Sequence, residues 1–138
     1  MNKIHIETRV YKDLQTTWEC YTNPQHITKW NFASDDWCCP HAEVDLREGG
    51  KAVSRMEAKD GSFGFDFAVT YTDVVPLQKL HYVMEDGRNA DITFTEQEGK
   101  TSVSITFDPE NQNPTEMQRQ GWQAILNNFK KYVELSNE

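Results

Sequence analysis

Large apolar side chains, most of them aromatic rings, are the residues of this 138-residue chain whose types and spacing best suit a functional site. Aromatic residues make up 12% of the chain, in which four are tryptophans. Apolar walls with a few polar groups are typical of small-ligand pockets. We therefore predict a ligand-binding set formed by Trp30, Phe32, Trp37, Phe65, Phe67, Tyr82, Met84, Trp122 and Phe129.

The same rings would also stabilise a filled core. Burial of one such side chain contributes ~1.5–3 kcal/mol without any ligand. The sequence therefore leaves open whether the space between these rings is open or filled. It also leaves the identity of the ligand open.

The acidic residues and histidines form no recognisable catalytic pair. Catalysis by a nucleophile or base needs a second group that orients it. His26 lies one helical turn before Trp30, a spacing that places it at the mouth of a pocket, whereas His41 and His81 fall on strand faces that we expect to be exposed. We predict no catalytic residue among the candidates, which are Asp35, Asp36, Asp66, His26, His41 and His81.

The cysteines predict neither a metal site nor a disulfide. Zinc ligands usually come in spaced pairs, with a second pair elsewhere in the chain. Cys38 and Cys39 are adjacent, so their side chains point apart in an extended segment. Together with Cys20 they make an odd number, which fits reduced thiols. We expect no metal and no cofactor.

Charge and hydropathy exclude two classes of partner. The chain carries a net charge of −8, and its longest basic run is Lys130–Lys131, which is too short to bind phosphates. No stretch approaches the ~20 apolar residues of a membrane span. The first residues run straight into a strand pattern without a signal-peptide core. We therefore predict a cytoplasmic protein without nucleic-acid or membrane partners.

The elements that must position the aromatic side chains are short strands followed by one long helix. Residues 31–40 show no period and predict an ordered loop. Gly49-Gly50, Asp60-Gly61 and Asp86-Gly87 mark tight turns, which favour antiparallel pairing of consecutive strands. Alternation of apolar and polar residues predicts strands over 3–11, 41–47, 51–59, 63–75, 79–85, 90–96 and 101–107.

Three helices complete the prediction. Asp13 caps a short helix after the first strand, and Asn23-Pro24 begins a second one that runs to about Trp30. Asn113 is predicted to cap the terminal helix, with Pro114 in its first position. Its apolar stripe consists of Met117, Trp122, Ile125, Leu126, Phe129 and Val133. We predict one α+β domain over 1–138, in which a curved antiparallel sheet of about seven strands packs on this helix.

Four stretches carry a resemblance to a known family. They are Asp45-Leu46-Arg47-Glu48-Gly49-Gly50-Lys51, Asn23-Pro24 through Trp30, Phe65-x-Phe67-x-Val69-x-Tyr71-x-x-Val74-x-Pro76, and Gly121-Trp122 through Phe129. In this order and spacing the chain resembles the START-like (SRPBCC, helix-grip) superfamily. Within it, the chain is similar to homologues of the C-terminal domain of the activator of the ninety-kilodalton heat-shock protein ATPase.

The resemblance implies a seven-stranded sheet that grips the C-terminal helix, with two short helices closing it. It also implies an apolar ligand between sheet and helix. Val69 replaces a smaller residue of the common pattern, a departure that narrows such a cavity. Arg47 could hold an anionic ligand group, but a structural role is favoured, in which Asp45 and Arg47 share one strand face and pair with neighbouring strands.

The function predicted is therefore non-catalytic binding of a small apolar or aromatic ligand. Two alternatives remain open from the resemblance. One is a protein-interaction module similar to the chaperone activator, and the other is an enzyme of cyclase or hydrolase type.

Overall fold

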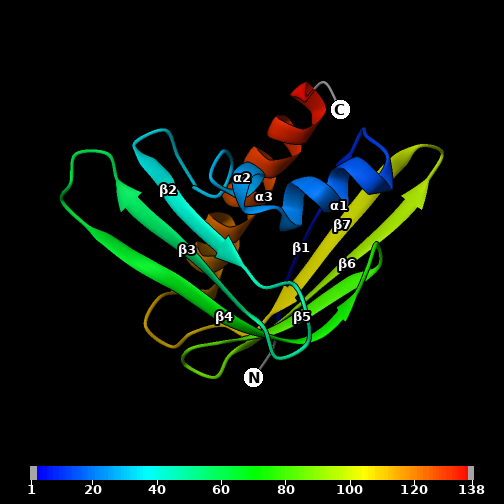
Figure 1. The fold of residues 1–138 in the computed structure, drawn as a ribbon. Coiled ribbons are helices and arrows are strands. Elements are labelled where there is room, and N and C mark those ends of the chain that lie inside the picture. The colour runs from blue at the N-terminus through cyan, green and yellow to red at the C-terminus, as the bar shows by residue number, and fades with distance from the viewer. Residues whose placement is uncertain (1–2, 137–138) are drawn as a thin grey trace.

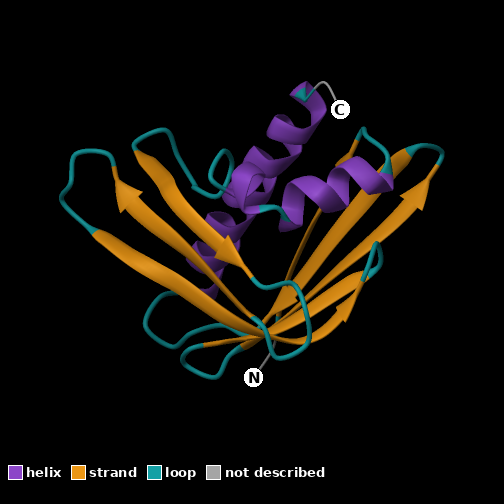
Figure 2. Cartoon of the chain, in the orientation of Figure 1, coloured by secondary structure: helices purple, strands orange, loops and turns teal. Residues whose placement is uncertain are grey.

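One curled antiparallel sheet of seven strands wraps around helix α3 (Thr115–Leu135) in the computed structural model, which describes residues 3–136 (Figure 1). The strand order is β1-β7-β6-β5-β4-β3-β2. The bounds are β1 (Ile4–Val10), β2 (Trp37–Val44), β3 (Lys51–Ala58), β4 (Gly64–Val75), β5 (Lys79–Met84), β6 (Asn89–Gln97) and β7 (Lys100–Phe107). The predicted α+β helix-grip architecture is confirmed (Figure 2).

Two short helices, α1 (Leu14–Thr22) and α2 (Pro24–Ile27), lie between β1 and β2. Both begin with the predicted caps. The Asp13 carboxylate accepts a hydrogen bond from the Thr16 backbone N–H at 3.0 Å, and the Asn23 side chain accepts one from the Gln25 N–H at 2.9 Å. The second helix ends at Ile27, earlier than predicted.

Strand β2 begins inside the segment that was predicted as a loop. It starts at Trp37 and pairs with β3 alone, as an edge strand. Its pairing register shifts between Cys38 and His41. Such a bulge accommodates Pro40, which has no N–H to donate to a neighbouring strand. The bulge in this edge strand therefore explains why apolar and polar residues do not alternate in this segment.

The start of α3 also differs from the prediction. Its N-cap is Pro114, and Asn113 caps nothing because its side-chain amide donates to the Glu110 carboxylate at 3.0 Å. Gln118 joins the preceding loop to the helix instead, with hydrogen bonds from its amide to the carbonyls of Glu110 and Asn113. Met117, predicted to be part of the apolar stripe, is 58% exposed.

The position of α3 is fixed along β1. Three polar side chains of α3 donate hydrogen bonds to the carbonyl oxygens of every second residue along this edge strand. The pairs are Arg119 to His5 at 2.6 Å, Gln123 to Glu7 at 3.3 Å and Lys130 to Arg9 at 2.6 Å. The helix thus covers an edge that would otherwise leave backbone groups unpaired.

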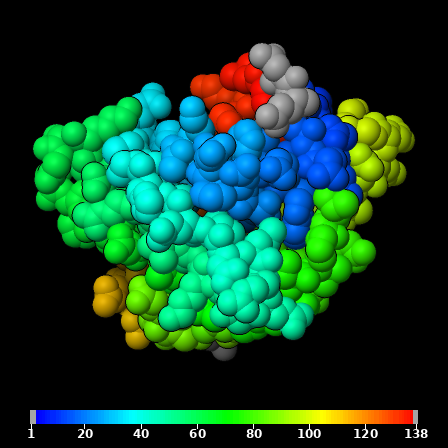
Figure 3. Space-filling model, viewed as in Figure 1, coloured from blue at the N-terminus to red at the C-terminus, as the bar shows by residue number. Residues whose placement is uncertain are grey.

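The main core lies under α3 and α1. Leu126, Phe129 and Val133 of α3 are buried against the inner face of β7, where every second residue is buried. Helix α1 packs on β6 and β7, and α2 packs on β2. The segments of α1, α2 and β2 form a continuous cover on the side seen in Figure 3. Across residues 3–136, no helix is long and apolar enough to span a membrane.

Candidate functional site

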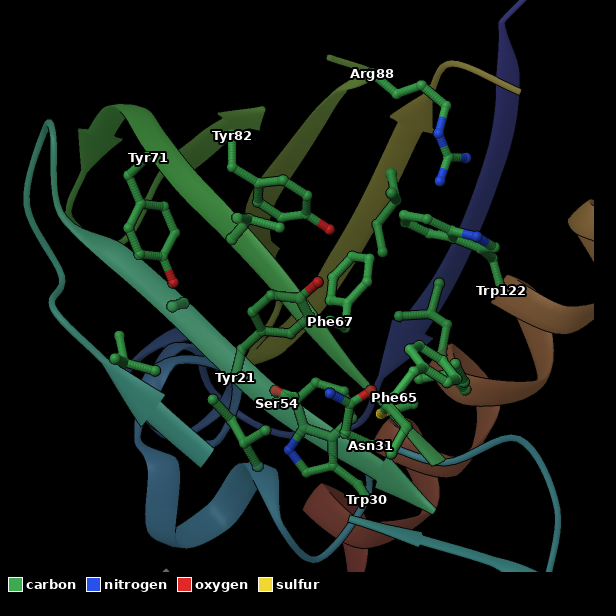
Figure 4. A pocket seen from close by; sticks show the side chains of 18 of the residues that line it. Tyr21, Trp30, Asn31, Ser54, Phe65, Phe67, Tyr71, Tyr82, Arg88 and Trp122 are labelled. Atoms are coloured by element: carbon green, nitrogen blue, oxygen red, sulfur yellow. The ribbon is translucent and has the colours of Figure 1, made fainter. Parts of the chain in front are cut away.

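A pocket of about 340 Å³ lies between α3 and the inner face of the β2–β5 half of the sheet (Figure 4). Strands β2 to β5 and β7 form one wall, and α3 with the segment around α2 forms the other. Its lining consists of Tyr21, Ile27, Trp30, Asn31, Val44, Ala52, Ser54, Met56, Phe65, Phe67, Val69, Tyr71, Tyr82, Arg88, Ile105, Glu110, Gln118, Trp122, Ile125 and Leu126.

Five of the nine predicted ligand-binding residues line this pocket. They are Trp30, Phe65, Phe67, Tyr82 and Trp122. The structure places the others elsewhere. Phe129 and Met84 lie buried in the core, and Trp37 packs against the exposed ring of Phe63 at a centroid distance of 6.1 Å. Phe32 lines a second hollow of about 290 Å³ on the outer side of α3. A role in ligand binding stays a prediction for all nine.

The two tryptophans of the pocket are held in place by the protein. Trp122 stacks on Phe107 with a centroid distance of 3.8 Å and an interplanar angle of 11°. The Trp30 indole N–H donates to the Cys20 carbonyl at 2.9 Å, and its ring packs edge-on against Phe129 at 4.8 Å. Rings fixed in this way form a preformed wall.

Three tyrosines from three elements bring hydroxyl groups into these apolar surroundings. Tyr21 lies on α1, Tyr71 on β4 and Tyr82 on β5, and the last two are paired residues of neighbouring strands. Burial raises the pKa of Tyr71 to about 12, and it also raises the pKa of Tyr21 and of Tyr82 well above the usual value. All three phenols therefore remain protonated at neutral pH.

Tyr21 and Tyr71 were missed by the sequence analysis as site residues. Tyr21 lies in the short helix predicted after Asp13, and Tyr71 lies in the strand predicted over residues 63–75. One feature of the sequence could have identified them, namely their hydroxyl groups, because the hydroxyl of a buried tyrosine normally needs a hydrogen-bond partner.

The glycine-containing loop between β2 and β3 positions Tyr71. The Gly49 N–H donates to the Tyr71 carbonyl at 2.8 Å, and the Tyr71 N–H donates to the Gly50 carbonyl at 2.9 Å. Gly49 has a φ of +84°, and a Cβ added at Gly50 would lie 2.1 Å from the Asp45 carbonyl oxygen. Arg47 is 71% exposed and pairs with Asp45 at 3.0 Å. This pair lies within the loop and not between strands as predicted, and the two glycines serve the turn, so the structure favours a structural role for this motif.

Arg88 lies at one end of the pocket, near Trp122 (Figure 4). Glu110 also lines the pocket, close enough to Arg88 to feel its charge. The Arg88 guanidinium donates to the Asp86 carboxylate at 2.8 Å and to the Asp108 carbonyl at 3.4 Å. A hydrogen bond from the backbone N–H of Asn113 is the main reason why the pKa of Glu110 lies below its usual range. Nothing in the sequence pattern distinguishes Arg88, which follows a turn.

The candidate catalytic residues do not come together. None of the described residues that line the pocket is one of them. His26 contacts the Tyr132 hydroxyl at 2.6 Å between α2 and α3, and His81 contacts Asp91 at 2.6 Å on the outer face of the sheet. His41 is exposed beside Glu43, Asp66 pairs with Arg55, Asp36 accepts from Ser34, and Asp35 lines the second hollow.

The three cysteines differ in their exposure to solvent. Cys20 and Cys39 are buried and Cys38 is partly exposed. Burial raises the pKa of the Cys39 thiol, so this group is a poor nucleophile. Within residues 3–136, no three potential ligands of the His, Cys, Asp and Glu types cluster in a way that could hold a metal ion.

Comparisons with known proteins agree with this architecture. A family model described as Activator of Hsp90 ATPase homolog 1-like protein matches residues 13–134. A solved AHSA1-like protein from Aeromonas hydrophila is 42% identical over 99% of this chain and 96% of its own, with a TM-score of 0.92. A solved protein from Cytophaga hutchinsonii is 44% identical over 97% and 93% of the two chains, with a TM-score of 0.84.

A more distant structure, from Nitrosomonas europaea, shares the fold at 16% identity, with a TM-score of 0.83 over 96% of this chain and 94% of that one. No curated protein matches the chain in sequence.

Proposed function

The chain belongs to the family of Activator of Hsp90 ATPase homolog 1-like proteins, and from this premise we propose that it binds a small, largely apolar molecule without transforming it. The observation that carries the proposal is the pocket of about 340 Å³ between the sheet and α3. Ligand sites in proteins typically measure ~300–1,000 Å³ and combine apolar walls with a few polar groups. The volume favours a compact ligand of a few rings.

The chemistry of the lining supports binding rather than catalysis. Among the described residues, its titratable side chains are three protonated tyrosines, Arg88 and Glu110. The two charged groups are both engaged by neighbouring turns and loops. An acyl or glycosyl transfer would need a nucleophile beside a base, an arrangement that this lining does not offer.

The proposal is tested with the neutral fluorescent probe N-phenylnaphthylamine and with native mass spectrometry of protein isolated from its own host. We expect saturable enhancement of probe fluorescence and a co-purifying small molecule. Ala52→Phe places a ring inside the pocket and should abolish probe binding. Ala68→Phe, on the opposite face of the neighbouring strand, is the matched control and should leave it intact. Saturable binding that is equally strong in both variants would place the probe outside this pocket and refute the proposal.

A second candidate function is suggested by an exposed aromatic surface beside the pocket. Phe63 is 60% and Phe65 41% exposed, and both rings contact Trp37 at centroid distances of 6.1 and 6.3 Å. Exposed apolar patches of this kind are enriched at protein interaction sites. The family description names an Hsp90 ATPase activator, so the matching test is the ATPase rate of an Hsp90-type chaperone with and without this protein. A rate that does not change would eliminate this candidate.

A further inference from the structure

The hydroxyls of Tyr21 and Tyr82 are polar groups that face the open pocket (Figure 4). Tyr82 is 8% and Tyr71 6% exposed, and both line the pocket. In Figure 4 the hydroxyls of Tyr82 and Tyr21 point toward the same part of the cavity. No hydrogen bond from the part of the chain that the structure describes reaches these hydroxyls. The fold thus buries the rings and aims their polar atoms at the space where a ligand would lie.

These hydroxyls act as donors. Burial raises the pKa of Tyr21 and Tyr82 far above the usual value of 10, and each is raised further by a neighbouring tyrosine, Tyr71 for Tyr21 and Tyr21 for Tyr82. Both protons therefore stay in place across the physiological range. Within residues 3–136 these hydroxyls are not among the fully buried polar atoms that lack a hydrogen bond, so they keep contact with the open pocket. An oxygen of a bound molecule would supply the acceptor there. A carbonyl oxygen, with two lone pairs, can accept from two hydroxyls.

The surroundings favour a neutral acceptor over an anion. The cation at the pocket end, Arg88, is already held by the Asp86 carboxylate and the Asp108 carbonyl. Glu110 adds a negative charge to the same pocket, and the chain carries a net charge of −8. Moving a carboxylate out of water costs far more than moving a ketone, and paired cations must offset that cost.

We propose that Tyr21 and Tyr82 form a hydrogen-bonding subsite for a neutral carbonyl oxygen, so that the ligand is an aromatic or alicyclic ketone rather than a plain hydrocarbon or an acid. This inference rests on the proposed function and deepens it. The apolar walls, including Phe67 and Trp122, hold the rings of the ligand. The two phenols select its orientation and its chemical class.

The test compares benzophenone with diphenylmethane, which differ only by a carbonyl in place of a methylene group. Both are measured by displacement of N-phenylnaphthylamine. The decisive quantity is the ratio of the two dissociation constants. We expect Tyr82→Phe and Tyr21→Phe to reduce the preference for benzophenone about threefold to tenfold each, the range for loss of one net hydrogen bond. The affinity for diphenylmethane should change little, because the rings remain.

Tyr11→Phe is the matched control, since Tyr11 is 60% exposed and lies outside the pocket. It should leave the ratio unchanged. If both compounds bind and the ratio of their dissociation constants is unchanged in Tyr82→Phe and in Tyr21→Phe, the carbonyl subsite is refuted, whereas the proposed function is not. Failure of both compounds and of the probe to bind overturns the proposed function as well. Tighter binding of diphenylacetate than of benzophenone would show that the site takes anions and would also refute the inference.

Discussion

The two halves of the curled sheet carry the same alternating pattern and yet differ in what they enclose. In β7 and β6 the inward residues are buried, among them Ile92 and Phe107 at 0% exposure. In β3, inward residues such as Ala52 and Ser54 remain half-buried and line the pocket. One half forms a closed core, and the other half forms a cavity wall.

The difference arises from the positions of the helices and from the small inward residues of β3, Ala52 and Ser54. Helix α3 is attached to the carbonyl edge of β1, and α1 lies on β6 and β7, so these elements fill the space above that half. The β2–β4 half curves away on the other side of α3 (Figure 1). Apolar side chains on this half therefore face a gap that is only partly closed by side chains from α2 and α3 and by Tyr21 at the end of α1. The inner face of a strand can thus border a core or a binding site, depending on the tertiary position of a helix as well as on the size of its own side chains.

Removing a large ring from the closed half should produce the largest effect. Phe107→Ala deletes a ring that is fully buried under Trp122 and should lower the free energy of unfolding by about 3–5 kcal/mol. Phe67→Ala, in the pocket wall, should cost roughly 1–2 kcal/mol because its ring already borders open space. Urea unfolding of both variants measures the difference. Equal costs would mean that the two halves are packed alike.

A larger side chain should also affect the two halves differently, and the greater loss of stability should again occur in the closed half. Ala90→Leu inserts a side chain at a position with 1% exposure and should destabilise the protein by about 1–3 kcal/mol through overpacking. Ala52→Leu inserts the same atoms into the pocket wall and should cost less than about 1 kcal/mol. Thermal unfolding of the pair checks this expectation. A larger loss for Ala52→Leu than for Ala90→Leu would contradict an open pocket.

These contrasts also explain what the sequence could predict. Alternation and turn residues are local properties, so the strands, the caps at Asp13 and Asn23 and the fold class followed from them. The bulged strand around Pro40 escaped prediction because a bulge removes the period on which strand prediction depends. The cap at Asn113 failed because Glu110 competes for its side chain.

The candidate site was harder to predict because lining a pocket is a tertiary property. Phe129 and Trp122 lie on the same helix stripe, yet one is buried in the core and the other lines the cavity. Their ring chemistry does not distinguish them, whereas their position relative to the two sheet halves does. Arg88 could not have been found, since its place at the pocket end depends on how the turn after β5 meets the loop after β7.

Alkaline pH should affect the open half through its tyrosines. Because the pKa of Tyr71 is raised to about 12 in the folded protein, the folded state keeps a proton that the unfolded chain loses near pH 10. Stability should therefore be unaffected below pH 10 and fall above it, by at most about 1.4 kcal/mol per pH unit for this group. Tyr71→Phe should reduce that slope in urea unfolding. An unchanged slope would show that burial does not hold this phenol in its protonated form.

The smallest effect is expected on the outer face, where polar residues neither pack nor bind. Burial lowers the pKa of His81, but hydrogen bonds with Asp91 and Asn89 outweigh it, and the net pKa lies above the usual 6.5. Because folding raises the pKa of His81, its protonated ring contributes its full stabilisation of the folded state below pH 6.5. This contribution is lost as the pH rises through the pKa of the folded state. His81→Ala should therefore cost more at acidic than at alkaline pH.

The cost of His81→Ala at acidic pH should exceed its cost at alkaline pH by less than about 1 kcal/mol, because His81 and Asp91 both retain exposure to solvent. His41→Ala is the counterpart on the β2 edge of the open half, where the ring is 66% exposed and 3.8 Å from Glu43. Unfolding experiments on both variants at two pH values compare them directly. A cost of His81→Ala that grows with rising pH would reverse the assigned sign. It would mean that Asp91 orients the imidazole without stabilising its charged form.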